Sequence, residues 1–342
     1  MRAVTDEIDV LGTPNRPSRF AWQDQFKSTL LVFWHTRWTL GMTDSGKRKF
    51  LLLGYGDNPS TPGRFLADGL TAIQQEIKIC HDTIDLAKVD LARCFGVVIV
   101  DCPSRPPVQL RNWQLAKNLP KIFWTYHGKH ILNQNIQLVK MYHADLVLMS
   151  SCLDLAKKFP VPVAFFPLAV PVNFFTGGPP LKQREIDLSF VGNNKGPLYV
   201  NRKESLKMIQ RNFPDRKIMF TKGVYLSDLA ALYQQSKLVY NDSVNQTMTL
   251  RIFEGIGARS LVVSDSLPEQ DQILAPDKHY VRYLNEADKL RKIRHYLHET
   301  AAAQIIADRG FHWVMKHHTF AIRAAQLLEI LSRSKLPNYA FQ

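Results

Sequence analysis

The sequence Thr249-Leu-Arg-Ile-Phe-Glu-Gly-Ile-Gly-Ala-Arg-Ser-Leu-Val-Val-Ser-Asp265 decides how the rest of the chain can fold. Its first half predicts a short helix, because Leu250, Phe253 and Ile256 recur at helical spacing on one face. Gly257 then breaks the helix, and the apolar run that follows predicts a buried strand. A helix that leads into a buried strand is a unit of an α/β fold.

The start of this helix carries a cation and an acid together. Arg251 and Glu254 are three residues apart and therefore share one edge of the helix. Free N–H groups at a helix N-terminus bind phosphate, Arg251 adds positive potential, and a carboxylate such as Glu254 accepts hydrogen bonds from a sugar diol. These features predict a nucleotide-sugar site. The spacing alone favours a second interpretation, namely an ordinary surface ion pair beside a core helix.

The run from Arg251 to Asp265, followed by Leu267-Pro-Glu269 and a helical tail, resembles the carboxy-terminal domain of CgeB-like GT-B glycosyltransferases. That family typically reads Arg-x-Phe-Glu-x-x-Ala-Cys-Gly before an apolar strand and an acid. The match is collinear from about residue 165 to 331, whereas the amino-terminal half shares only the general α/β rhythm. Further agreeing segments are Ile186-Asp-Leu-Ser-Phe-Val-Gly192, Tyr225-Leu-Ser-Asp-Leu229 with Leu232-Tyr-Gln-Gln-Ser-Lys-Leu-Val-Tyr-Asn241, and His318-Thr-Phe320 with Arg323 and Leu327-Leu328.

The resemblance implies a GT-B fold, in which two Rossmann-like lobes with parallel sheets face a central cleft. One position departs from the pattern of many retaining GT-B enzymes, Glu-x-x-x-x-x-x-x-Glu, whose second acid binds ribose and whose first lies near the donor sugar. Glu254 keeps the second acid, but eight residues earlier the chain has Gln246. The departure weakens the inference about sugar contacts more than the inference about the fold.

Apolar runs alternate with helical patterns along the chain, which predicts parallel sheets with ligands at the carboxyl ends of the strands. In the first half the expected strands are 50–53, 77–80, 96–101, 121–126, 144–149 and 163–166, and the expected helices are 63–75, 86–93, 106–118, 131–142 and 153–159. After a strand that ends near residue 191, the expected elements are helices 202–211, 226–235, 287–297, 301–317 and 320–331 and strands 217–220, 237–240 and 261–264. The predicted domains are an N-terminal extension (1–45), an acceptor-side lobe (46–170), a nucleotide-sugar lobe (171–325) and a C-terminal helix and tail (326–342) that crosses back to the first lobe.

Polar and flexible residues follow several of the predicted strands. The predicted donor-binding residues are Gly54, Gly56, Gly192, Asn193, Lys195, Lys222, Thr247, Thr249, Arg251 and Glu254. Gly54 and Gly56 lack the full Gly-x-Gly-x-x-Gly fingerprint, so a tight turn is the alternative there. The resemblance implies that Lys195 and Lys222 neutralise a leaving diphosphate. It also implies that His127, after the strand 121–126, is a catalytic candidate near the donor sugar.

The formal charge of +14 predicts an anionic partner, either an acceptor or nucleic acid, although the cations are scattered along the chain. The segment 26–40 combines aromatic residues with cations and fits either contact with a membrane surface or packing on the protein's own body. No long apolar run and no signal peptide is evident, and Cys80, Cys94, Cys102 and Cys152 lack metal-ligand spacing, so a cytoplasmic location with or without membrane contact is expected.

The sequence therefore predicts a glycosyltransferase that uses a nucleoside diphosphate sugar as donor and an unidentified acceptor. It contains no Asp-x-Asp, so metal-independent chemistry without a cofactor is expected, and the resemblance implies retention of configuration. Two alternatives are a nucleotide-sugar-binding protein without turnover and a glycosyltransferase that modifies nucleic acid.

Overall fold

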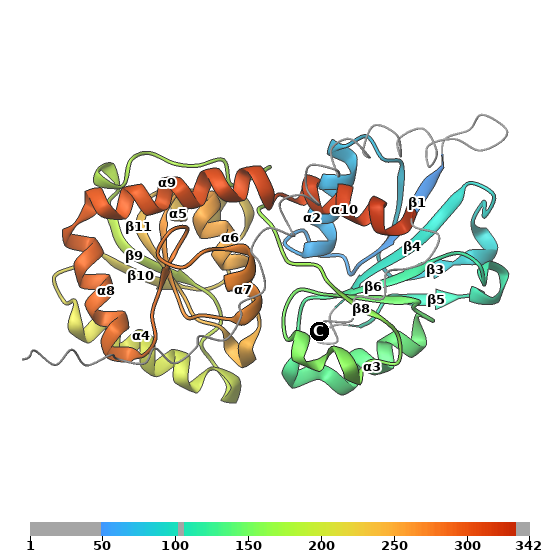
Figure 1. Cartoon of the computed structure of the whole chain (residues 1–342), viewed down its shortest axis with the longest axis horizontal. Coiled ribbons are helices and arrows are strands. Elements are labelled where there is room, and N and C mark those ends of the chain that lie inside the picture. The colour runs from blue at the N-terminus through green and yellow to red at the C-terminus, as the bar shows by residue number, and fades with distance from the viewer. Residues whose placement is uncertain (1–48, 102–105, 333–342) are drawn as a thin grey trace, which may run out of the picture.

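The computed structural model describes residues 49–101 and 106–332, which contain two parallel sheets (Figure 1). The first sheet has the strand order β2-β1-β4-β6-β7-β8. Its strands are β1 (Phe50–Gly54), β2 (Ile77–Cys80), β4 (Cys94–Asp101), β6 (Lys121–Thr125), β7 (Leu146–Met149) and β8 (Val163–Phe165). In the central strands the register places Val98 between Leu53 and Ile122, and all three side chains are buried, as continuous apolar runs require.

Helices α2 (Pro62–Ala72) and α3 (Leu132–Met141) connect strands of this sheet. Thr61 caps α2 by accepting a hydrogen bond from the Arg64 backbone N–H, and Pro62 occupies the first helical position, where no N–H is needed. A Cβ atom on Gly69 would lie 2.3 Å from the carbonyl oxygen of Phe320. The glycine thus lets α2 pack closely against α10 (Phe320–Ser332).

The predicted helix at 106–118 is wrong. This stretch instead forms β5 (Gln109–Arg111) and a short 3₁₀ helix at Trp113–Ala116, and β5 pairs with β3 (Thr83–Asp85), which was not predicted. Consecutive prolines at 106 and 107 disfavour a helix start, and the pairing supplies backbone partners that the local pattern cannot reveal. The predicted helices at 86–93 and 153–159 are also shorter 3₁₀ turns, at Leu86–Lys88 and Leu153–Lys158.

The second sheet has the order β10-β9-β11-β12-β13 and is also parallel. Its strands are β9 (Ile186–Val191), β10 (Ile218–Thr221), β11 (Ser236–Asn241), β12 (Leu261–Ser264) and β13 (Val281–Arg282). The helices around it are α4 (Val200–Asn212), α5 (Leu226–Gln234), α6 (Leu250–Gly257), α7 (Pro268–Ile273), α8 (Glu286–His298) and α9 (Thr300–His317). The sequence predicts these elements except α7 and β13, which are among the shortest.

Two segments of chain connect the lobes and lie against each other. Val170 forms a bridge with Thr319, and the Val170 N–H donates to the His318 carbonyl oxygen at 2.8 Å. The chain crosses once before β9 and once between α9 and α10, so α10 packs on the first lobe after α9 has covered the second (Figure 1).

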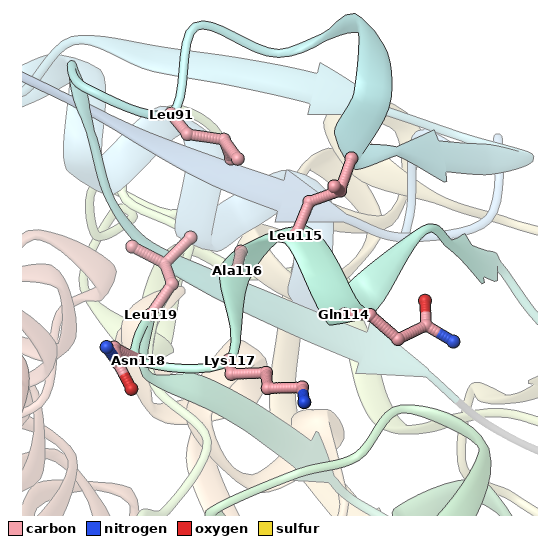
Figure 2. A pocket seen from close by; sticks show the side chains of 7 residues that line it. All are labelled: Leu91, Gln114, Leu115, Ala116, Lys117, Asn118 and Leu119. Carbon is pink, nitrogen blue, oxygen red and sulfur yellow. The ribbon is translucent and has the colours of Figure 1, made fainter.

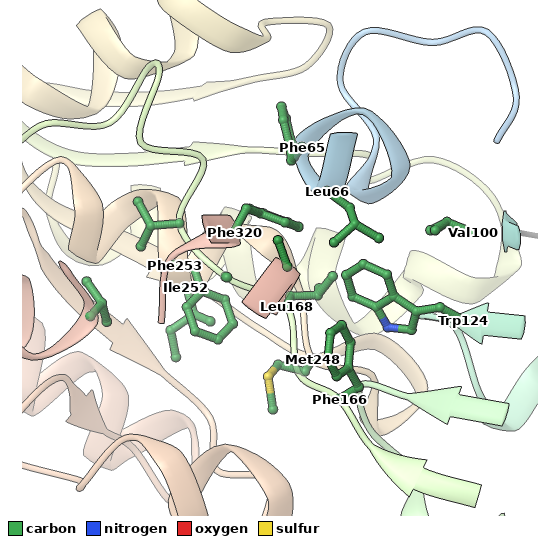
Figure 3. Close-up of a cluster of buried hydrophobic side chains, with 14 of the residues drawn as sticks. Phe65, Leu66, Val100, Trp124, Phe166, Leu168, Met248, Ile252, Phe253 and Phe320 are labelled. Atoms are coloured by element: carbon green, nitrogen blue, oxygen red, sulfur yellow. The ribbon is translucent and has the colours of Figure 1, made fainter. Parts of the chain in front are cut away.

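One apolar cluster continues from the first lobe into the second (Figure 3). Trp124 and Phe166 meet edge to face at 5.0 Å on the first-lobe side, while Ile252 and Phe253 of α6 extend the cluster on the other side. The apolar surface that this cluster buries between the lobes stabilises their contact. In the described part of the chain no helix is long and apolar enough to cross a membrane. The segment 26–40 and Cys102 lie outside the described residues.

Candidate functional site

The candidate site lies at the carboxyl edge of the second sheet. Because the strands are parallel, the residues that follow β9, β10, β11 and β12 meet at this edge. The backbone N–H of Gly192 donates to the Thr221 carbonyl oxygen at 3.0 Å, which fixes the first two loops side by side. Helix α6 begins nearby, because it follows directly from the loop after β11.

Arg251 in the first turn of α6 returns its side chain to this edge. Its Nε donates to the Val191 carbonyl oxygen at 2.9 Å, and its Nη1 donates to Asn241 Oδ1 at 2.8 Å. The guanidinium lies over the Phe190 ring at 4.3 Å from the centroid, and only 8% of the residue is exposed. Arg251 forms no ion pair with any residue that the structure describes. It is therefore a buried cation without a direct ion-pair partner in the described part of the chain.

Gly192 and Arg251, both predicted donor-binding residues, lie in contact. A Cβ atom on residue 192 would lie 2.4 Å from Arg251 Nη2. The glycine thus lets the guanidinium lie directly against the backbone at residue 192.

Glu254 lies one turn further along α6. Its side chain forms neither a hydrogen bond nor an ion pair with any described residue, including Arg251. Burial raises the pKa of the Glu254 carboxyl to about 7, and the positive charge of Arg251 opposes this rise. The interpretation of these two residues as a surface ion pair is wrong, because Arg251 is buried and directs its donors to Val191 and Asn241.

The structure adds two residues that the sequence reasoning missed. Arg202 on α4 donates to Asp242 Oδ1 at 2.6 Å and to the Asn193 carbonyl oxygen at 2.8 Å. Its guanidinium also lies against Phe190, at 5.3 Å from the ring centroid. Burial lowers the pKa of Arg202, and the charge of Arg251 lowers it further. Two guanidinium groups therefore share one aromatic ring, and Asp242 neutralises one of them.

Asn241, the second missed residue, organises the start of α6. Its Oδ1 accepts hydrogen bonds from Arg251 and from the Thr249 hydroxyl, each at 2.8 Å, and its Nδ2 donates to Ser264 Oγ at 2.8 Å. The Thr247 hydroxyl, predicted to meet phosphate, donates to the Asn245 carbonyl oxygen at 3.5 Å. Asn241 directly follows the predicted strand 237–240, and a polar residue immediately after an apolar run is the signal that could have identified it.

The remaining predicted residues of this lobe lie on exposed loops. Asn193 Oδ1 accepts a hydrogen bond from the Lys195 backbone N–H at 3.1 Å, which forms a local turn. The side chains of Lys195 and Lys222 are exposed and form no ion pair with described residues. Gly196 and Gly223 adopt positive φ angles of 95° and 75°, so these loops depend on glycine.

The predicted site residues of the first lobe are His127, Gly54 and Gly56. A Cβ atom on Gly54 would lie 2.9 Å from Ile84 Cδ1, so this glycine packs against Ile84, and its predicted role in donor binding stays a prediction. Gly56 borders open space. His127 follows β6 and is half-buried, and its carbonyl oxygen accepts hydrogen bonds from Thr125 Oγ1 at 2.9 Å and from Asn135 Nδ2 at 2.8 Å. These bonds fix the backbone at His127.

The loop that precedes α6, residues 244–249, rests on the first lobe. The Met248 N–H donates to Ser151 Oγ at 3.2 Å, and the Cys152 thiol donates to the Gln246 carbonyl oxygen at 3.3 Å. Lys129 Nζ donates to Gln246 Oε1 at 2.6 Å. The start of α6 therefore borders groups from both lobes.

A surface hollow of about 430 Å³ lies elsewhere (Figure 2). It is lined by Leu91 and by residues 114–119, which precede β6 and thus lie at the amino end of the first sheet. Ligands of parallel α/β sheets bind at the opposite end, so this hollow is separate from the candidate site.

Comparison with known proteins identifies the fold class. Residues 179–329 match the family model described as glycosyl transferase-like. Among solved structures, an alpha-glucosyltransferase in complex with UDP and a 13-mer DNA containing a HMU base is similar, with a TM-score of 0.56 and 11% identity over 83% of this chain and 98% of that chain.

Sucrose-phosphate synthase from Thermosynechococcus elongatus gives a TM-score of 0.58 and 10% identity over 82% of this chain and 98% of that chain. A glycosyltransferase from Rickettsia africae ESF-5 gives a TM-score of 0.56 and 14% identity over 83% of this chain and 98% of that chain. A search of curated protein sequences finds no match. The predicted GT-B fold is confirmed, whereas membership of the CgeB-like group stays a prediction.

Proposed function

We propose that this chain is a glycosyltransferase that transfers a sugar from a nucleoside diphosphate donor to an acceptor. The observation that carries the proposal is the pair on α6, in which the buried Arg251 guanidinium has no ion pair and the half-buried Glu254 carboxyl has no hydrogen bond among the described residues. Removing a charge from water without pairing it with an opposite charge costs free energy, and a ligand that brings an anion to Arg251 and hydrogen-bond donors to Glu254 offsets this cost. A nucleoside diphosphate offers phosphate oxygens to Arg251 and ribose hydroxyls to Glu254.

The proposed chemistry places positive charge where negative charge develops. When the bond between the sugar C1 and the diphosphate breaks, charge grows on the leaving diphosphate. In this proposal the N-terminus of α6 and Arg251 lie nearest to the leaving diphosphate, and Lys195 and Lys222 supply further positive charge from the exposed loops. Retention of configuration and independence from metal, as the resemblance implies, belong to this proposal. A position of His127 beside the donor sugar is also part of this proposal.

The first test is calorimetric titration with uridine, guanosine and thymidine diphosphates and their hexose derivatives. We expect at least one to bind, and we expect Glu254→Ala to weaken that binding about tenfold or more, because a charge-assisted hydrogen bond contributes about 1.5 to 3 kcal/mol. Glu185→Ala is the matched control, since Glu185 is an exposed acid at the opposite end of the same sheet. Equal binding by Glu254→Ala and wild type would refute the assignment of the site.

A second measurement separates an enzyme from a binding protein. Many transferases release the sugar slowly to water when no acceptor is present, and this hydrolysis can be followed as free nucleoside diphosphate. We expect wild-type protein to release it faster than Glu254→Ala at saturating donor. Binding without any release, in the presence of a broad panel of acceptors, would favour a nucleotide-sugar-binding protein.

A nucleic-acid acceptor is the second candidate, and the formal charge of +14 favours it. One structurally similar alpha-glucosyltransferase is in complex with DNA. If nucleic acid is the acceptor, its binding constant falls steeply with salt concentration, because counterions are released. A flat salt dependence would exclude this candidate.

A further inference from the structure

We propose that Lys129 and Gln246, from opposite lobes, bind an anionic group on the donor's sugar, and that the matching donor carries a uronate, a hexose oxidised to a carboxylate at C6. This inference rests on the proposed function and names the substrate class of the same site. The observation behind it is the bond from Lys129 Nζ to Gln246 Oε1 at 2.6 Å, between residues that are 117 positions apart.

The charge on Lys129 is not neutralised by the protein. Its ammonium is exposed, and it donates a hydrogen bond to a neutral amide oxygen, Gln246 Oε1. Lys129 forms no ion pair with any described residue. Glu269 is a carboxylate that also joins the lobes, but its Oε1 already accepts a hydrogen bond from the Leu153 N–H at 2.8 Å. The ammonium therefore keeps its capacity to bind an anion.

The pair lies where a donor's sugar would extend. Residues 244–249 lead directly into α6, whose first turn carries Arg251. In this proposal a diphosphate binds at Arg251 and the N-terminus of α6, and its sugar extends towards this loop and towards the first-lobe residues that contact the loop. Lys129 and Gln246 belong to those two facing segments.

The loop holds Gln246 in a fixed backbone conformation. Asn245 and Gln246 have φ angles of 54° and 56°, which are unfavourable for residues other than glycine. The contacts from Cys152 to the Gln246 carbonyl oxygen and from the Met248 N–H to Ser151 secure this geometry. Only the side chain of Gln246 is free to adjust to a ligand.

The chemistry of the two side chains favours a carboxylate. An ammonium has three donors and no acceptor, and a glutamine whose oxygen is occupied offers its NH₂ group. A carboxylate at C6 accepts from both, and its bond to the ammonium is charge-assisted. A glutamate at position 246 would instead pair with Lys129 and repel the uronate. The amide thus keeps the lysine available.

The test compares two donors that differ only at C6. Binding is measured with three compounds of whichever nucleoside diphosphate the wild-type protein prefers, namely the bare diphosphate, its hexose derivative and its uronate derivative. For uridine these are UDP, UDP-glucose and UDP-glucuronate. We expect the uronate to bind about tenfold more tightly than the hexose, the range of one charge-assisted hydrogen bond. Lys129→Met and Gln246→Glu should each abolish this preference and leave the affinity for the bare diphosphate within twofold. Lys140→Met, which removes an exposed lysine on α3, should retain the preference.

The outcomes separate the two proposals. If the bare diphosphate binds and depends on Glu254, but hexose and uronate bind equally, the uronate inference is overturned and the proposed function stands. If the preference exists but survives Lys129→Met, another group recognises the carboxylate and the inference is also overturned. If no nucleoside diphosphate binds, the proposed function fails, and the inference fails with it.

Discussion

Arg251 passes so close to Gly192 that residue 192 cannot carry a side chain without moving the guanidinium. The distance from a Cβ atom at this position to Arg251 Nη2 would be 2.4 Å. The loop after β9 and the first turn of α6 therefore fit against each other at the sheet edge, although Gly192 and Arg251 are 59 residues apart in sequence. The position of the proposed phosphate-binding cation depends on both.

We therefore expect Gly192→Ala to displace Arg251 and weaken donor binding about tenfold, with a loss of about 1 to 3 kcal/mol in the free energy of unfolding, as for other overpacked sites. Calorimetric titration and chemical denaturation measure the two effects. A double-mutant cycle with Arg251→Lys supplies the control, because the shorter ammonium removes the clash and the cost of Gly192→Ala should shrink. Additive effects would show that the contact is not the cause.

The pKa of Glu254 predicts how donor binding depends on pH. Burial raises this pKa to about 7, and only the ionised carboxylate accepts hydrogen bonds from both ribose hydroxyls. Affinity for a nucleoside diphosphate sugar should therefore fall about tenfold between pH 8 and pH 6, since one pKa unit corresponds to about 1.4 kcal/mol. A diphosphate sugar is the right probe, because it lacks the terminal phosphate that titrates near this range. The Glu254→Gln variant should show a flat profile.

The same group affects the stability of the free protein in the opposite sense. Glu254 binds its proton more tightly in the folded than in the unfolded state, so its stabilising contribution is present below about pH 4.5 and is lost as the pH rises through about 7. The free energy of unfolding of wild type relative to Glu254→Gln should decrease over that interval. A constant difference across the interval would show that the carboxyl is not desolvated in solution.

The sequence predicted most of the fold because most strands of the two sheets are short apolar runs followed by a turn; β13, which has two residues, was missed. It missed the pairing of Thr83–Asp85 with Gln109–Arg111, since both strands are three residues long and largely polar, and only tertiary contact makes them strands. The predicted helix at 106–118 failed for the same reason.

The sequence placed Arg251 and Glu254 on one helix edge but could not show where Arg251 points. The Arg251 side chain points to its hydrogen-bond acceptors on Val191 and Asn241. These two residues lie close together only because β9 and β11 are neighbours in the second sheet. Arg202 was missed because it lies in a helix rich in charged residues, where a cation normally faces solvent. Only the adjacency of β9 and β11 reveals its contact with Asp242.

Arg184 should be among the most important residues for stability outside the candidate site. Its buried guanidinium donates to the carbonyl oxygens of Pro179, Tyr233, Ser236, Ala258 and Arg259 and to Ser260 Oγ. Burial lowers the pKa of Arg184 to about 10. We expect Arg184→Met to lower the free energy of unfolding by about 3 to 5 kcal/mol, because several buried carbonyl groups lose their donor.

Denaturant unfolding of Arg184→Met and Arg184→Lys measures this effect. Lysine restores one charge but only three donors, so it should recover a minor part of the loss. Lys182→Met, two residues earlier and exposed, is the matched control. A loss below about 1 kcal/mol for Arg184→Met would show that water replaces the arginine at these carbonyl groups.

Arg323 should couple the two segments that connect the lobes. It is 1% exposed, and it donates to the Pro167 carbonyl oxygen at 2.8 Å on one segment and to His318 Nδ1 at 2.6 Å on the other. Because Nδ1 accepts this bond, His318 must be neutral, and burial lowers its pKa well below the ordinary value. Arg323→Met should therefore loosen both segments at once and separate the unfolding of the two lobes.

Scanning calorimetry with tryptophan fluorescence tests this coupling, since Trp124 reports on the first lobe and Trp313 on α9 of the second. Wild type should unfold in one transition, because one apolar cluster spans both lobes, and Arg323→Met should show two resolved transitions or a calorimetric enthalpy above the van't Hoff value. Arg309→Met, on α9, serves as the control for removal of an arginine. A single transition in Arg323→Met, merely shifted to lower temperature, would mean that the shared cluster alone holds the lobes together and that Arg323 contributes stability without coupling.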